Sequence, residues 1–319
     1  MIHSRPQKLS LVVPVFNEEE AIRPFLDRTL PVVERAAALV SAETSVEILF
    51  VNDGSTDATA AILGALSRRD ARIKLVNLSR NFGKEAAVAA GLNYASGDAI
   101  IPIDVDLQDP PELIEPMVVK WLAGAKAVEA VRTDRASDSW YKRLTANWFY
   151  TLYNRFADQP IRENVGDFRL LDREVVDVLR NLSERSRFNK ALYSWAGFAC
   201  ETVEFTRERR SAGTTKWKYW RLWNFALDGL TASTTAPLRI WTYLGAFTAI
   251  GAFAYAAFIV IHTVMFGVDS PGYASMLTVV LFMGGLNMLA LGIMGEYVGR
   301  IAKEVRGRPL YVVQSTLGF

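Results

Sequence analysis

The sequence is poor in cysteine: Cys200 is the only one in 319 residues. A single thiol excludes an internal disulfide framework and suits a reducing compartment. The N-terminal stretch MIHSRPQKLS has no apolar core of the secretory-signal type, so we expect the first 210 or so residues to stay in the cytoplasm. The net charge of +2 and the lack of a basic tract with interleaved aromatics before residue 200 argue against nucleic acid as a partner.

Basic residues are also missing from one long segment. Between Arg239 and Arg300 there is no Lys or Arg, and only two residues are acidic. Two apolar runs, about 238–265 and 276–298, occupy this gap, and each is longer than the roughly 20 residues that cross a bilayer core. We therefore predict a transmembrane hairpin over 237–301; the alternative is a pair of buried core helices.

The flanks of this hairpin predict its orientation. Basic residues precede and follow it but are absent from the connecting loop, so both ends are expected on the cytoplasmic side of an inner membrane, with 302–319 as a cytoplasmic tail. Aromatic and basic residues alternate over 211–236, which favours amphipathic helices on the membrane surface over an aromatic core stripe. Small residues in the second run (Gly284, Gly285, Gly292) permit close helix approach, so we expect a homo-oligomer.

The first 130 residues lack a GxGxxG turn, which argues against a nicotinamide or flavin cofactor. They alternate uniformly apolar runs with helical stretches. The runs are 9–15, 46–51, 73–78 and 99–103, and the helices are expected at about 18–40, 56–69 and 84–95. This alternation predicts a doubly wound α/β fold whose ligands bind at the carboxyl ends of parallel strands.

Polar motifs follow each predicted strand: PVFNEEE, NDGSTD, SRNFGKE and DVDLQDP. Within them, Asp53 can accept a hydrogen bond from a base or ribose, and Gly83–Lys84 opens a helix where free amides and an ammonium can face phosphate. The alternatives for both motifs are structural, namely a helix cap with a turn glycine and a solvated helix start.

The acidic motif predicts a metal site. Asp104, Asp106 and Gln108 are hard oxygen ligands spaced by two along an extended segment, so their side chains should face the same way. Such ligands suit Mg²⁺ or Mn²⁺ bridging to a diphosphate, whose departure the ion would assist.

Together these motifs carry a resemblance. PVFNEEE, FVNDGSTDAT, RNFGKE, GDAIIPIDVDLQDP, VGDFRLLDR and AGTTKW, followed by two apolar runs, resemble the polyisoprenyl-phosphate glycosyltransferases of family 2, with a GT-A fold. The likeness spans nearly the whole chain and is strongest to the bactoprenol (undecaprenyl-phosphate) glucosyltransferases of O-antigen modification; dolichol-phosphate mannose synthase is a more distant relative.

The resemblance implies roles for individual residues. It places the nucleotide on Pro14, Asn17 and Glu18, with its base at Asp53. Gly83, Lys84 and Asp104 complete the nucleotide-sugar site that we expect. The resemblance places the metal on Asp104, Asp106 and Gln108. Many relatives have an acidic residue where this chain has Asn52, which weakens any role for that position.

An acceptor lipid phosphate needs positive charge to hold it. Candidates from the sequence are Arg132, Arg135, Arg169, Arg207, Arg209, Arg210 and Lys216. For the RERR segment, general attraction to anionic lipids is an equal alternative. Asp167 is a candidate to orient a sugar hydroxyl or to act as the base; the alternative is an internal salt bridge between Asp167 and Arg169.

The expected function is inverting transfer of glucose from UDP-glucose to undecaprenyl phosphate, giving a β-linked sugar phosphate for a cell-surface glycan. A different sugar (mannose, galactose or a modified arabinose) is the first alternative, and a non-catalytic, membrane-tethered nucleotide-sugar-binding scaffold is the second. A separate flippase is expected as a pathway partner, because a two-span hairpin offers no path for a sugar head group.

Overall fold

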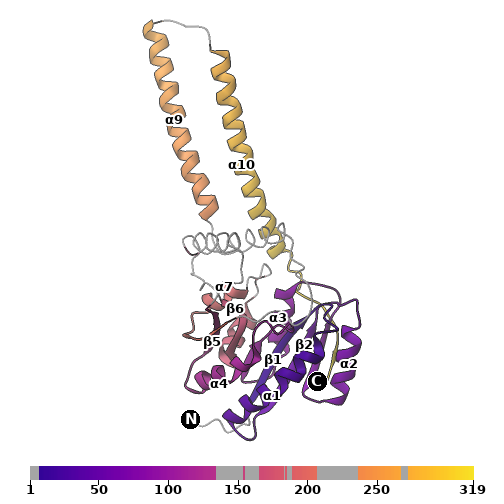
Figure 1. Cartoon of the computed structure of the whole chain (residues 1–319). Coiled ribbons are helices and arrows are strands. Elements are labelled where there is room, and N and C mark those ends of the chain that lie inside the picture. The colour runs from indigo at the N-terminus through magenta and orange to yellow at the C-terminus, as the bar shows by residue number, and fades with distance from the viewer. Residues whose placement is uncertain are drawn as a thin grey trace.

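The computed structural model describes residues 7–133, 154, 165–182, 184, 189–206, 236–266 and 272–319. The segment 211–235, where surface helices are expected, lies outside these residues. The described chain forms an α/β domain from which two long helices extend (Figure 1). The domain has three layers, with helices on both faces of one sheet, as the alternating sequence pattern predicts.

The sheet has eight strands in the order β7-β5-β6-β4-β1-β2-β3-β8. Its centre (β3, β2, β1 and β4) is parallel, whereas β6 and β8 run antiparallel to their neighbours. The strand bounds are β1 Lys8–Val15, β2 Ser45–Asn52, β3 Ile73–Leu78, β4 Ala99–Pro102, β5 Ala127–Arg132, β6 Val165–Asp172, β7 Cys200–Phe205 and β8 Val313–Leu317. The four strands expected from apolar runs are all present.

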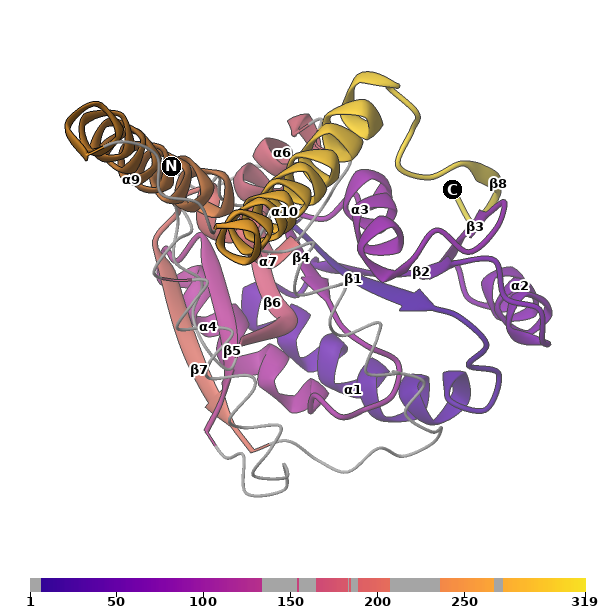
Figure 2. The same cartoon turned by 90° about the horizontal axis from the view of Figure 1, so that it is seen from above.

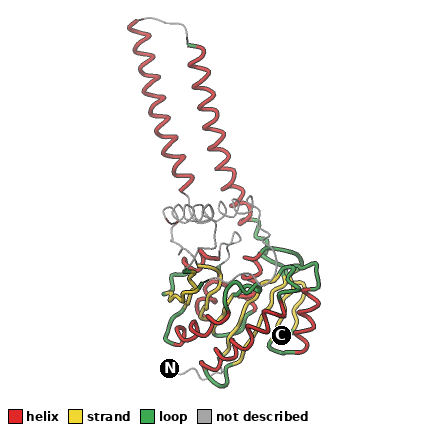
Figure 3. Tube along the Cα trace, in the orientation of Figure 1, coloured by secondary structure: helices red, strands yellow, loops and turns green. Residues whose placement is uncertain are grey.

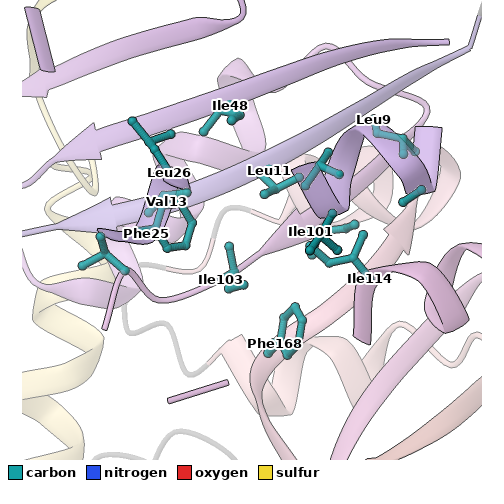
Figure 4. Packing of buried hydrophobic residues seen from close by; sticks show 14 of the residues in the cluster. Leu9, Leu11, Val13, Phe25, Leu26, Ile48, Ile101, Ile103, Ile114 and Phe168 are labelled. Atoms are coloured by element: carbon teal, nitrogen blue, oxygen red, sulfur yellow. The ribbon is translucent and has the colours of Figure 1, made fainter. Parts of the chain in front are cut away.

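Two apolar clusters hold the layers together, one on each face of the sheet. On the first face, side chains such as Leu11 and Val13 of β1 meet Phe25 of α1 and Ile114 of α4 (Figure 4). On the second face, alternate strand residues such as Val12 contact α3 and α6. The helices of the domain are α1 Ile22–Val40, α2 Thr59–Arg69, α3 Lys84–Tyr94, α4 Ile114–Leu122 after the 3-10 turn Pro111–Leu113, α6 Arg173–Asn181 and α7 Asn189–Trp195.

Two of these helices begin later than the sequence predicts. α1 begins at Ile22 instead of residue 18, and α2 at Thr59 instead of residue 56. The intervening residues form rim loops: Asn17 has a positive φ of 54°, and Asp57 accepts the amide of Thr59. Polar residues at these helix starts therefore bond to backbone in the loops and do not extend the helices.

The C-terminal segment contributes a strand to the α/β domain. The sequence analysis expected residues 302–319 only as a cytoplasmic tail. β8 pairs antiparallel with β3, and the Ser79 amide donates to the Val312 carbonyl at 2.9 Å. Figure 2 shows the chain leaving α10 and passing to the outer edge of the sheet. The domain thus contains residues from both sides of the helical hairpin.

The hairpin consists of α9 (Ala236–Phe266) and α10 (Tyr273–Val305). The two helices run side by side away from the domain, and α7 lies on the side of the domain from which they extend (Figures 1 and 3). Among the residues that the structure describes, no helix is both long enough and apolar enough to cross a membrane.

Candidate active site

The acidic motif follows β4 at the carboxyl end of the parallel strands. Val105 and Leu107 are buried, while Asp104, Asp106 and Gln108 are partly exposed, but residues 105–109 form a turn and not the extended segment that the sequence analysis expected. Leu107 has a positive φ of 56°, an uncommon conformation for a branched residue. Leu107 is buried in this turn, and the turn carries the acceptor oxygens at the rim of the sheet.

Lys84 joins two acidic residues that are far apart in the sequence. Its Nζ lies 2.7 Å from Asp104 Oδ2 and 2.9 Å from Asp167 Oδ2. The three side chains are 40%, 31% and 20% exposed, so the cluster is partly buried but still reached by solvent. The antiparallel direction of β6 explains this meeting, because the first residues of β6 lie at the same rim as the last residues of β4.

Charges in this cluster shift one another's pKa values. Burial alone would raise the pKa of Asp167, but the ammonium groups of Lys84 and Lys190 lower it to about 2. Burial opposes the charge of Lys84, yet the two carboxylates raise its pKa above the ordinary value. Burial and the charge of Asp167 raise the pKa of Glu85 to about 7. Asp167 and Lys84 are therefore both ionised at neutral pH.

Asp53 is buried and contacts the loop before α3. Its Oδ1 accepts the Phe82 amide at 2.7 Å, and its Oδ2 accepts the Gly83 amide at 2.9 Å. Desolvation raises the pKa of Asp53 despite these two hydrogen bonds. The carboxylate thus fixes the loop that leads into Lys84, a contact that the sequence reading did not anticipate.

Asn17 connects the first rim loop to the second. Its backbone amide donates to Ser55 Oγ at 3.0 Å, and its side-chain Oδ1 accepts the backbone amide of Thr56 at 2.8 Å. The neighbouring Glu18 amide donates to Thr59 Oγ1 at 3.0 Å. The two loops expected to hold the nucleotide therefore form one bonded unit after β1 and β2, with Pro14 near the end of β1.

Arg169 has different contacts from those expected of a phosphate ligand. Its side chain is 3% exposed, and its guanidinium bonds Glu129 at 3.1 Å and the Gly166 carbonyl at 2.9 Å. The Tyr193 ring stacks on it at 3.9 Å. The internal salt bridge is therefore with Glu129 of β5, and Arg169 lies beneath the rim.

The remaining candidates for the acceptor phosphate divide into two groups. Arg132 is partly buried at the end of β5, which runs in the same direction as β4 because both are antiparallel to β6. β5 therefore ends at the same rim of the sheet as the Lys84 cluster, and Arg132 lies there. Five residues lie outside the described part of the chain: Arg135, Arg207, Arg209, Arg210 and Lys216.

The structure adds residues that the sequence reading missed. Glu85, inside the quoted motif SRNFGKE, accepts the Asn189 amide at 2.9 Å and so attaches α7 to the start of α3. The signal in the sequence that could have identified Glu85 was its position directly after Lys84 in this motif. Among the described residues, no group of three or more His, Cys, Asp or Glu is placed to hold a metal ion.

With this geometry in view, comparison with known proteins identifies the family. Residues 10–180, more than half of the chain, match the model of glycosyl transferase family 2. This chain belongs to glycosyl transferase family 2. Residues 236–301 of this glycosyltransferase also match the GtrB C-terminal hairpin. The family is a group of enzymes, and the rim described above is the part of the domain where its α/β fold places ligands.

Relatives match the glycosyltransferase over almost its full length. A bactoprenol glucosyl transferase of Shigella phage SfX is 49% identical, covering 97% of this chain and 99% of its own. The SfII prophage-derived bactoprenol glucosyl transferase of Shigella flexneri is 50% identical, with 97% and 98% covered. An uncharacterized glycosyltransferase of Synechocystis is 47% identical, with 98% and 96% covered.

Solved structures are more distant. Mannosyl-3-phosphoglycerate synthase from Rubrobacter xylanophilus is 18% identical and aligns with a TM-score of 0.49 over 70% of this chain and 71% of that one. This likeness is too weak to carry a conclusion about substrates.

Proposed function

We propose that this glycosyltransferase moves glucose from UDP-glucose to undecaprenyl phosphate and inverts the anomeric centre. The observation that carries the proposal is the 49–50% identity to bactoprenol glucosyl transferases over nearly the full length of both chains. The rim supports it, because Lys84 and two carboxylates lie together where the fold binds ligands.

The residues of the acidic motif fit a divalent cation. Asp104, Asp106 and Gln108 offer hard oxygen atoms from one partly exposed edge, and Mg²⁺ or Mn²⁺ prefers such donors. Lys84 already brings one positive charge to Asp104, which supports a preference for cations at this edge. When bound, the ion would neutralise charge on the departing diphosphate.

The chain's own residues would orient the reaction. A lipid monophosphate is largely dianionic at neutral pH, so its oxygen needs positioning more than deprotonation. Lys84 would hold donor phosphate oxygens through its ammonium. Asp167, with its lowered pKa, would accept a hydrogen bond from a sugar hydroxyl and so fix the ring at the rim.

Direct attack then has a simple balance. The acceptor phosphate oxygen forms a bond to the anomeric carbon as the bond from that carbon to the diphosphate oxygen breaks. UDP leaves with the electron pair, and an α-linked donor gives a β-linked product. No proton has to move, in keeping with the ionised state of Asp167.

Although no described helix meets the length and hydropathy expected of a membrane span, we also propose that α9 and α10 lie in a bilayer, with the domain on the cytoplasmic face. The segment 240–299 has no Lys or Arg, and apolar side chains along both helices face outward, among them Phe247 (76% exposed) and Val264 (82%). Exposed apolar area on this scale needs an apolar partner. Both ends of the hairpin lead to the same domain, because β8 returns to the sheet after α10.

The reaction is tested by transfer of radiolabel from a panel of nucleotide sugars to undecaprenyl phosphate, with and without EDTA. We expect an organic-extractable product from UDP-glucose alone, lost on chelation, with a β-anomeric signal by NMR. Label from another sugar would correct the donor and keep the mechanism. Nucleotide binding without transfer from any donor would contradict the proposal and favour a non-catalytic scaffold.

The membrane placement is tested by cysteine labelling in intact cells after Cys200→Ser. Gly272→Cys, at the start of α10, should react with an impermeant maleimide added outside. The matched variant Arg306→Cys, just after α10, should react only after lysis. Equal labelling at both positions, or release of the protein by alkaline carbonate, would contradict a spanning hairpin.

A further inference from the structure

A chain of side-chain hydrogen bonds crosses the sheet edge from the C-terminal strand to the rim loops. Asn77 Nδ2 donates to Ser315 Oγ at 3.0 Å, and Asn52 Nδ2 donates to Asn77 Oδ1 at 2.9 Å. The backbone amide of Ser55 donates to Asn52 Oδ1 at 3.0 Å, and the backbone amide of Asn17 donates to Ser55 Oγ at 3.0 Å. We call these five residues the amide ladder.

The amide ladder has one direction throughout its two asparagines. Each uses its NH₂ group toward β8 and its carbonyl oxygen toward the rim. Turning Asn52 over would break two hydrogen bonds, whereas turning Asn77 over would break only its bond to Asn52, because the Ser315 hydroxyl can also donate. Asn52 is 4% exposed, and an unmet amide there would carry the full cost of desolvation. The ladder therefore holds Asn52, and with it the turn at Ser55, in a single orientation.

Ser315 is itself held in place by β8. The Asn93 Nδ2 group donates to Tyr311 OH at 2.7 Å just before this strand. After it, the Phe319 ring packs against the Tyr94 ring with centroids 5.6 Å apart. The hydroxyl of Ser315 thus approaches Asn77 from a segment that is anchored at both of its ends.

The far end of the ladder lies in the loops of the proposed donor site. Asn17 and Ser55 belong to the two motifs that follow β1 and β2, and Thr56 bonds Asn17 as well. Displacing Asn52 would free the Ser55 amide and loosen both loops together. No such link is visible in the sequence, because Ser315 follows Asn77 by 238 positions.

We propose that Ser315 and Asn77 are positioning residues for nucleotide binding, so that the segment following the hairpin completes the donor site. The inference rests on the donor half of the proposed function. It assigns a task to residues that touch no substrate: they fix Asn52 and, through it, the loops at Ser55 and Asn17.

The test is UDP binding to the full-length protein in detergent, by calorimetry. Ser315→Ala should weaken UDP binding by roughly three- to ten-fold, the effect of one net hydrogen bond. Thr316→Ala is the matched control one residue along the same strand and should bind UDP like the wild type. Ser315→Thr keeps a hydroxyl and should restore most of the affinity.

A double-mutant cycle separates positioning from simple support of the fold. Asn77→Ala and the double variant with Ser315→Ala should each show about the same loss as Ser315→Ala alone, because one broken link opens the whole ladder. In transfer assays, KM for the donor should rise while kcat stays unchanged.

The possible contrary outcomes act at three levels. Wild-type UDP affinity in Ser315→Ala would overturn the positioning role, as would a lower Tm with unchanged affinity. Additive losses in the cycle would overturn the ladder as a unit. A wild-type protein that binds no UDP would overturn the proposed function itself.

Discussion

Two clusters of lysine and carboxylate lie at opposite ends of the same parallel strands. At the amino ends, Glu47 is 2% exposed and accepts hydrogen bonds from Ser10 Oγ, the Ser96 amide and Ser96 Oγ, with Lys74 Nζ 2.7 Å away. At the carboxyl ends, Lys84 meets Asp104 and Asp167 and stays 40% exposed. The first cluster is closed by protein donors, whereas the second is open to a ligand.

The difference lies in what surrounds the same chemical groups. Serine hydroxyls and a backbone amide fill the space around Glu47, so nothing remains for a substrate to supply. Around Lys84 the neighbours are acidic, and the acidic motif continues outward to Asp106. We therefore expect substitutions in the closed cluster to change stability, and those in the open cluster to change activity.

The largest effect should follow from Asp106→Asn. Loss of one carboxylate from the proposed metal edge should lower transfer at least about 100-fold, as does removal of a group that stabilises developing charge. The Tm should stay near that of the wild type, since the side chain is partly exposed. Asp27→Asn, on the exposed side of α1, is the control in both assays. A large fall in Tm would remove the contrast between the clusters.

Lys84→Met should lower transfer by about 10- to 100-fold, because the ammonium would no longer meet phosphate oxygens. Lys84→Arg keeps the charge and should retain more activity than Lys84→Met. Unfolding free energy should change by about 1 kcal/mol or less, as for other solvent-screened ion pairs. Chemical denaturation and initial rates measure the two quantities. Equal activity in the Met and Arg variants would exclude a role for the charge.

Glu47→Gln should show the reverse pattern. Removing one partner of a buried pair leaves Lys74 uncompensated, and the expected loss is about 3 kcal/mol of unfolding free energy. Activity per folded molecule should match the wild type. Glu112→Gln, which breaks an exposed pair with Arg28, should cost well under about 1 kcal/mol and serves as the comparison. A drop in kcat for Glu47→Gln would mean that the closed cluster reaches the site.

The Glu47 carboxylate should make the unfolding free energy of the wild type fall at acid pH. Burial alone would raise the pKa of Glu47, but hydrogen bonds from Lys74, Ser10 and Ser96 lower it below its ordinary value of 4.5. The stabilisation is therefore present above pH 4.5 and is lost as the pH falls through the lower folded-state pKa. Denaturation at several pH values should show a shallower acid slope in Glu47→Gln. Parallel slopes would contradict the assignment.

Sequence reasoning located the open cluster better than the closed one. Apolar runs identified the strands, and polar motifs at their carboxyl ends identified the rim, because ligands of parallel sheets bind there. The closed cluster joins Ser10, Glu47 and Ser96 across separations of 37 and 49 positions, and its residues sit inside or beside apolar runs without a motif. Long-range pairing of this kind has no local signal.

The direction of side chains was the second feature that could not be predicted from the sequence, after long-range pairing. Asp167 and Arg169 are two positions apart in β6, which favours a shared face, yet Asp167 bonds Lys84 while Arg169 bonds Glu129 beneath the rim. The difference follows from the antiparallel pairing of β6 with β5, which brings Glu129 opposite Arg169. The return of β8 to the sheet after the hairpin was likewise not predicted from its short, mixed sequence.

The smallest expected effect is that of Ser96→Ala. This variant tests how much one of the hydrogen bonds to Glu47 contributes to the stability of the closed cluster. This change removes the hydroxyl that donates to Glu47 Oε1 at 2.8 Å but keeps the backbone amide on Oε2 at 2.9 Å. The remaining donors, Lys74 and Ser10, stay in place, so about 1 kcal/mol of unfolding free energy should be lost with no change in kcat. Denaturation of Ser96→Ala, Glu47→Gln and the double variant gives the coupling. If the serine acts only through Glu47, the double variant should be no less stable than Glu47→Gln; additive losses would show that Ser96 stabilises the sheet by another route.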